Sequence, residues 1–154
     1  MERKVENKSR ARSRACSLRN DGNGMTNFEF ISHIERLKIH NFRGYIMRDE
    51  VTKLKPLDKE CGALNLDNSE NEGTHTVCWF KDGNKKYYFD SFGVQPPKEL
   101  IKYLKSPIMY STYQIQQFND TNCSEWCLYV LNELNRGKEF KEIILEIISK
   151  YKLY

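Results

Sequence analysis

The sequence lacks any long hydrophobic run. No apolar stretch in its 154 residues approaches the ~18 residues of a membrane-spanning helix. The first residues also lack the apolar segment of a secretory signal peptide, so we expect neither a membrane protein nor a Sec-exported one. Glycine and proline are scarce, with 8 and 4 residues, and this excludes collagen-like and other low-complexity chains.

The five cysteines lack the pattern of a disulfide-rich or zinc-binding domain. Their odd number and irregular spacing favour a reducing, intracellular compartment. A structural zinc site needs two close pairs of ligands, whereas only Cys123 and Cys127 are close and the three histidines are scattered. We therefore expect no metal site. The cysteines are Cys16, Cys61, Cys78, Cys123 and Cys127.

Positive charge is concentrated at the start of the chain. Residues 1–24 hold seven basic and three acidic side chains, which equals the net charge of +4 for the whole chain, so residues 25–154 are neutral. This composition predicts a disordered tail ahead of one domain over residues 25–154, and the 39% hydrophobic content of the whole chain suffices for a single core. The tail could contact DNA phosphates. Alternatively, it is a solvated extension, or Met25 is the true start.

The spacing of apolar residues predicts the order of the elements. A capping box at Thr26-Asn-Phe-Glu29 opens a helix over about 26–38, and residues 39–59 are expected to be irregular. Asp82-Gly83 predicts a type I′ hairpin turn. The predicted strands cover about 61–66, 74–80 and 85–90. Three later helices are predicted: one that begins at Pro96-Pro97, one over about 122–137 and one over 140–151. This order predicts an α+β fold in which a hairpin is packed by helices.

Three polar features could carry chemistry. If Asp82 and Gly83 are the turn residues, His75 lies directly opposite Asp90, where the carboxylate would orient the imidazole. Cys123 falls at the start of a helix, where backbone N–H groups favour a thiolate, and Gln116 precedes it. Each feature also has a plain structural interpretation: a polar pair at a sheet rim, a cysteine packed in the core, and a solvated glutamine. Cys127 is expected to face the core.

In this order, the residues resemble the adenovirus-type cysteine proteases (the adenain family), most closely the proteases of Polinton/Maverick elements and related viruses. The blocks that carry the resemblance are Cys61-Gly-Ala-Leu-Asn65, Gly73-Thr-His75 with Tyr88-Phe-Asp90-Ser-Phe-Gly93, and Gln116-x6-Cys123-x3-Cys127-Leu. They cover roughly residues 60–135, and Asn41-Phe-Arg-Gly44 extends the match toward Met25.

The resemblance implies a papain-like topology reordered so that histidine precedes cysteine, with a mixed sheet around a central hairpin. It implies a cysteine endopeptidase that cleaves viral or transposon precursor proteins, such as capsid proteins. His75 would be the general base, Asp90 its orienting acid, Gln116 the oxyanion donor and Cys123 the nucleophile. No metal or organic cofactor is implied, although DNA or an activating peptide could serve as one. The implied protein is a monomer in the host nucleus or cytoplasm, or packaged in virions.

The sequence departs from this family at two places. Thr76 stands where the family usually has the tryptophan that shapes the cleft, and Ser124-Glu125 stands where a glycine usually follows the nucleophile. Reduced activity is one consequence of such changes. Three alternatives therefore remain: an isopeptidase acting on ubiquitin-like tails, a catalytically decayed binding module, and a small DNA-binding accessory protein.

Deleting residues 1–24 tests the role of the tail. We expect the deletion to leave peptide cleavage unchanged and to weaken DNA binding, because the net positive charge is lost with it. The measurement is DNA affinity at several salt concentrations, where log affinity falls by ~0.9 per neutralised phosphate for each unit of log salt. Identical affinities and slopes for the full chain and for a chain starting at Met25 would rule out a DNA-binding role for the tail.

Overall fold

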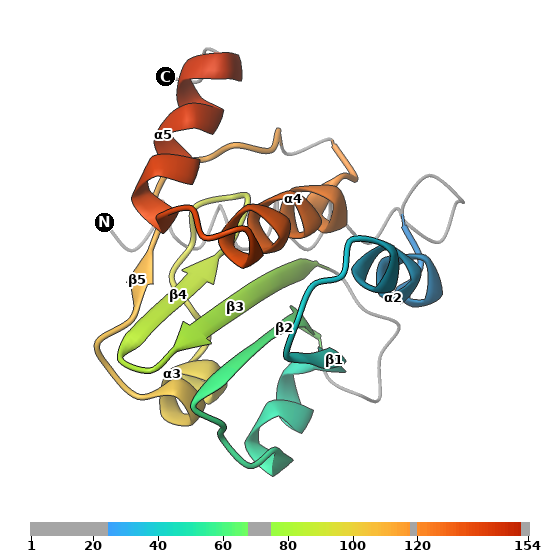
Figure 1. Cartoon of the computed structure of the whole chain (residues 1–154), viewed down its shortest axis with the longest axis vertical. Coiled ribbons are helices and arrows are strands. Elements are labelled where there is room, and N and C mark those ends of the chain that lie inside the picture. Colours follow the sequence, from blue (N-terminus) through green and yellow to red (C-terminus); the bar gives the residue numbers. More distant parts are fainter. Residues whose placement is uncertain (1–24, 68–74, 118–119, 152–154) are drawn as a thin grey trace.

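A mixed five-stranded sheet forms the centre of the computed structural model, which describes residues 25–67, 75–117 and 120–151 (Figure 1). Strands β2, β3 and β4 are antiparallel, and the edge strands β1 and β5 pair in parallel with β2 and β4. The strands are β1 (Phe42–Met47), β2 (Lys59–Asn65), β3 (Thr76–Asp82), β4 (Lys85–Phe89) and β5 (Met109–Tyr110). The helices are α2 (Asn27–Arg36), the 3-10 helix η2 (Arg48–Lys53), α3 (Lys98–Leu104), α4 (Cys123–Asn135) and α5 (Phe140–Tyr151). This architecture confirms the predicted α+β class.

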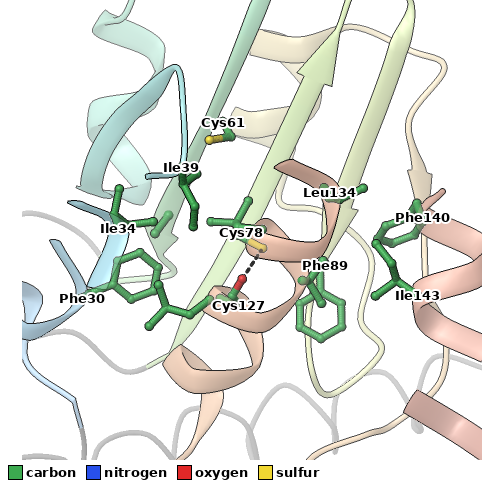
Figure 2. Packing of buried hydrophobic residues seen from close by; sticks show 14 of the residues in the cluster. Phe30, Ile34, Ile39, Cys61, Cys78, Phe89, Cys127, Leu134, Phe140 and Ile143 are labelled. Carbon is green, nitrogen blue, oxygen red and sulfur yellow. Dashed lines mark hydrogen bonds between the residues drawn. The ribbon is translucent and has the colours of Figure 1, made fainter. Parts of the chain in front are cut away.

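Helices cover both faces of the sheet. On one face, α2, α4 and α5 pack over Cys61, Cys78 and Phe89, and Figure 2 shows Cys127 of α4 lying over Cys78 of β3. On the other face, α3 and η2 pack over the side chains of Trp79 and its neighbours. None of the helices in the described ranges combines the length and apolarity needed to cross a bilayer.

The predicted helices form close to their expected limits. Thr26 caps α2, because its Oγ1 accepts a hydrogen bond from the Glu29 N–H at 3.2 Å. Gly137 follows the end of α4 with a φ of 93°, and its N–H donates to the Leu134 carbonyl. The last helix spans Phe140–Tyr151 as predicted.

The prediction of an irregular segment over residues 39–59 is wrong. The segment over residues 39–59 contains strand β1 and helix η2. All six residues of β1 are half-buried, so the strand has no alternation of apolar and polar side chains for a sequence pattern to detect. Its extended conformation is stabilised by parallel pairing with β2, a contact between distant segments. Strand β5, only two residues long, was likewise not predicted.

The predicted hairpin register is also wrong. Asp82 pairs with Lys85, so the two turn residues are Gly83 and Asn84. Gly83 has a φ of 60° and Asn84 has no positive φ, as in a type II′ turn rather than type I′. Both dipeptides are good turn formers, and the structure selects the second because Asp82 also pairs with Lys59 of β2. The ladder therefore ends at Cys78 and Phe89, and it does not place His75 opposite Asp90.

Gly62 of β2 is required by close packing against Trp79. A Cβ atom at position 62 would lie 2.3–2.8 Å from three atoms of the Trp79 ring, which is 1% exposed and donates through Nε1 to Glu60 at 3.0 Å.

We expect Gly62→Ala to lower the free energy of unfolding by about 1–3 kcal/mol, measured by urea denaturation. The loss should be smaller in a Trp79→Phe background, which removes the clashing atoms. An equal loss in both backgrounds would show that the clash is not the cause.

Candidate active site

His75 and Asp90 lie just beyond the paired ends of β3 and β4 and contact each other. His75 Nε2 is 2.9 Å from Asp90 Oδ1, and the two side chains have no exposed area. The same carboxylate oxygen accepts the Phe92 N–H at 2.8 Å. The Phe92 ring stacks on the imidazole, with ring centroids 4.8 Å apart and planes 11° apart. The predicted contact between the two side chains is therefore present. A turn after β4 produces this contact, not the predicted position opposite one another in the ladder.

A tight turn at Asp90–Gly93 brings the segment before α4 to this pair. The Gly93 N–H donates to the Asp90 carbonyl at 2.8 Å, and Gly93 has a φ of 69°. A Cβ atom at position 93 would lie 2.4 Å from the Thr112 carbonyl oxygen, so only glycine lets the chain pass this closely. As a result, the backbone N–H groups of Ile115 and Gln116 reach the Ser91 carbonyl.

The Gln116 side chain is fixed on both sides. Its Oε1 accepts from Ser91 Oγ at 2.6 Å, and its Nε2 donates to the Asp120 carbonyl at 2.7 Å. These bonds orient the amide and tie it to the sequence neighbours of Asp90 and Cys123. Nε2 carries two hydrogens, and among the described residues only Asp120 accepts from it, which leaves one hydrogen for a ligand.

Cys123 is the first residue of α4, as the sequence predicted. Asn122 precedes the helix without making a side-chain capping bond, so its side chain does not occupy the first-turn N–H groups. The Cys123 side chain lies close enough to His75 to help raise the pKa of the imidazole. The structure therefore brings Cys123, His75 and Asp90 into one connected group, with Gln116 anchored beside them.

The environment of His75 acts on its pKa in opposite directions. Complete burial lowers the pKa, but the negative charge and hydrogen bond of Asp90, with the contacts to Cys123, outweigh it and raise the pKa above the ordinary value. Because folding raises this pKa, protonated His75 stabilises the fold below the pKa of an exposed histidine. That stabilisation is lost as the pH rises through the raised pKa.

All four predicted site residues are buried. His75 and Cys123 are 0% exposed, and Asp90 and Gln116 are 1% exposed. Cys127 is buried as predicted, its Sγ donates to the Thr76 carbonyl at 3.5 Å, and burial raises its pKa well above that of a free thiol.

Two of the three residues that depart from the family pattern lie in the interior. Thr76 and Ser124 are both 0% exposed, and Ser124 Oγ donates to Thr76 Oγ1 at 3.1 Å, whereas Glu125 is exposed. Sequence reasoning gave no role to Ser91, which supports Gln116, or to Phe92, which stacks on His75, although both lie in the quoted Tyr88–Gly93 block.

Two further observations concern the chemistry of the site. No disulfide joins any two of the four cysteines in the described part of the chain. Within the same residues, no group of three histidine, cysteine or acidic side chains gathers as a metal site would require. The side chains near Cys123 include an imidazole, a carboxylate and an amide, which are kinds of group that acyl transfer can use.

Comparison with solved structures identifies proteins of similar fold. The chain is similar to the pS273R protease of ASFV, with 18% identity and a TM-score of 0.58 over 79% of this chain and 61% of that one. A Se-Met structure of that protease gives 18% identity and a TM-score of 0.54 over 84% and 66%. The SUMO protease Ulp1, at 18% identity over 96% and 91%, gives a TM-score of only 0.43. No protein-family model and no curated protein matches the sequence.

These comparisons establish the fold. The chain has the α+β architecture of the pS273R-type cysteine protease and spans about three fifths of that protein's length, with a coverage of 61%. The predicted fold class is thereby confirmed.

Asp90→Asn tests the electrostatic origin of the His75 pKa. Asparagine keeps the size and the acceptor oxygen but removes the charge, so we expect the pKa of His75 to fall relative to the unsubstituted protein. The measurement is an NMR titration of the imidazole ring, with the His75 signal assigned by its loss in His75→Gln. His33 and His40 serve as internal references, and an unchanged His75 titration would contradict the assigned cause.

Proposed function

We propose that the chain is a cysteine endopeptidase that uses Cys123, His75, Asp90 and Gln116. The single observation that supports this best is the buried hydrogen bond between His75 and Asp90 at 2.9 Å, with the Cys123 side chain close enough to help raise the pKa of His75. A cysteine, a histidine and an orienting third group are the parts of an activated thiol nucleophile. The similarity of fold to a cysteine protease supports the same conclusion.

Each residue then has a defined part in peptide hydrolysis. Asp90 accepts a hydrogen bond from the Nε2–H group of His75 and so directs Nδ1 toward Cys123. His75 takes the thiol proton, and Cys123 Sγ bonds to the carbonyl carbon of the substrate. The Cys123 N–H and the second Gln116 Nε2 hydrogen stabilise the oxyanion. His75 then protonates the leaving amine as the C–N bond breaks. Water, deprotonated by His75, hydrolyses the thioester to release the acid and restore the thiol.

The burial of the group has a consequence for substrate binding. Because Cys123 has no exposed area, the enzyme binds substrate only in an opened form. The apparent affinity is then reduced by the fraction of molecules in that form. In return, excluding water strengthens the hydrogen bonds and charge interactions within the group. The free energy needed for opening favours an extended peptide as the ligand over a small molecule. An extended peptide makes many backbone contacts, and these can offset the cost of opening.

The resemblance to adenain-type proteases and to those of Polinton/Maverick elements supports a capsid or other precursor protein as the substrate. The test is incubation of the full chain with candidate precursors. We expect His75→Ala and Cys123→Ala each to lower kcat by at least ~10³-fold, and the double variant to be little worse than either, because the two residues act as a unit. His33→Ala and Cys61→Ala are matched controls that should retain activity.

Three outcomes would contradict the proposal. Additive losses in the double variant would show that His75 and Cys123 do not share a mechanism. Release of a ubiquitin-like C-terminal conjugate without cleavage of internal peptide bonds would indicate an isopeptidase. Precursor binding with no cleavage and no covalent adduct at Cys123 would indicate a binding module.

A further inference from the structure

A chain of buried hydrogen bonds connects four elements beneath the candidate site. Ser124 Oγ of α4 donates to Thr76 Oγ1 of β3 at 3.1 Å, and Thr76 Oγ1 lies 2.6 Å from the Tyr45 hydroxyl of β1. Asn65 of β2 donates through Nδ2 to the same Tyr45 hydroxyl at 3.3 Å. Thr76 and Ser124 are 0% exposed and Asn65 is 4% exposed, whereas Tyr45 is half-buried, so the bond between Ser124 and Thr76 is the one that lies wholly in the interior.

The position of this chain relates it directly to the reacting groups. Thr76 follows His75, and Ser124 follows Cys123. The bond between the two hydroxyls therefore joins the backbone just after the base to the backbone just after the nucleophile. A second bond, from Cys127 Sγ to the Thr76 carbonyl at 3.5 Å, holds the next turn of α4 against the same residue of β3.

We propose that Thr76 and Ser124 are positioning residues, whose hydroxyl–hydroxyl bond holds the start of α4 against β3 so that Cys123 stays within reach of His75. The proposal rests on the proposed function, because it concerns the geometry of that same pair. Each hydroxyl supplies a buried hydrogen-bond partner for the other, and Thr76 Oγ1 has a second partner in the Tyr45 hydroxyl.

The expected size of the effect follows from the geometry of proton transfer. The base must lie within hydrogen-bonding reach of the thiol, and a displacement of about 1 Å can cost on the order of 10²-fold in rate. Loss of the hydroxyl bond removes one of the two hydrogen bonds that α4 side chains make to Thr76, while the Cys127 bond remains. We therefore expect a partial loss, of about 10-fold, rather than abolition.

The test measures the rate of Cys123 alkylation by iodoacetamide in the folded full chain from pH 5 to pH 10, by peptide mass spectrometry. We expect Thr76→Val and Ser124→Ala each to slow alkylation at pH 7 by about 10-fold and to move its pH profile toward that of an ordinary thiol. The double variant should be no slower than Thr76→Val, because Thr76→Val already removes the Ser124 bond together with the Tyr45 contact, whereas Ser124→Ala removes the first alone. Thr76→Ser keeps the hydroxyl, so its Cys123 should be alkylated at the rate of the unsubstituted chain.

A control variant separates positioning from stability. Tyr103→Phe removes a buried hydroxyl that bonds Glu60 at 2.7 Å, on the α3 face of the sheet, and should destabilise the fold without slowing alkylation. A purely structural role predicts the opposite sign for Thr76→Val and Ser124→Ala. Because Cys123 is buried, a looser fold would expose it more often and speed its alkylation. Unchanged or faster alkylation in these variants would overturn the proposal.

The same experiment distinguishes failure of this proposal from failure of the proposed function. If the unsubstituted chain cleaves precursors but the variants react as it does, positioning is wrong and the endopeptidase stands. Suppose instead that the chain cleaves no precursor, while the alkylation rate of Cys123 still depends on His75, Thr76 and Ser124 as described. The positioning proposal then stands and the endopeptidase proposal is wrong. If alkylation is the same in His75→Ala as in the unsubstituted chain, His75 does not activate the thiol and both are wrong.

Discussion

The buried hydrogen bond between His75 and Asp90 is the interaction around which the candidate site is organised. Burial alone would favour a neutral imidazole, and the carboxylate at 2.9 Å reverses that preference. The carboxylate is itself held by the Phe92 N–H, and the Phe92 ring covers one face of the imidazole. The imidazole is therefore held in one orientation, as the proposed proton transfer requires.

The turn that follows Asp90 extends this organisation to the opposite side of the site. Because Gly93 permits contact with the Thr112 backbone, the Ser91 carbonyl and hydroxyl can both bond to Gln116. One four-residue turn thus orients the imidazole and the amide together. The nucleophile arrives separately, on α4, and its placement depends on how that helix packs against β3. Cys78 and Cys127, which lie over one another in Figure 2, belong to this packing.

The hairpin shows how a sequence pattern can lead to the right contact for the wrong reason. Asp82-Gly83 and Gly83-Asn84 are both suitable turn pairs, and the local sequence does not separate them. Choosing the first sets His75 opposite Asp90 in the ladder, whereas the observed register ends the ladder before either residue. The contact forms because the chain turns immediately after β4 and returns the Asp90 side chain to His75.

The sequence by itself determined the elements whose signals are local. Capping at Thr26, helical periodicity in α4 and α5, and Gly137 at the end of α4 required no knowledge of distant residues. The order of His75, Asp90, Gln116 and Cys123 also sufficed to suggest the chemistry. Only the tertiary structure decided the strand β1, the hairpin register, the burial of the site and the bond between Thr76 and Ser124. These depend on pairing and packing between segments far apart in the chain, and no local pattern encodes which of them meet.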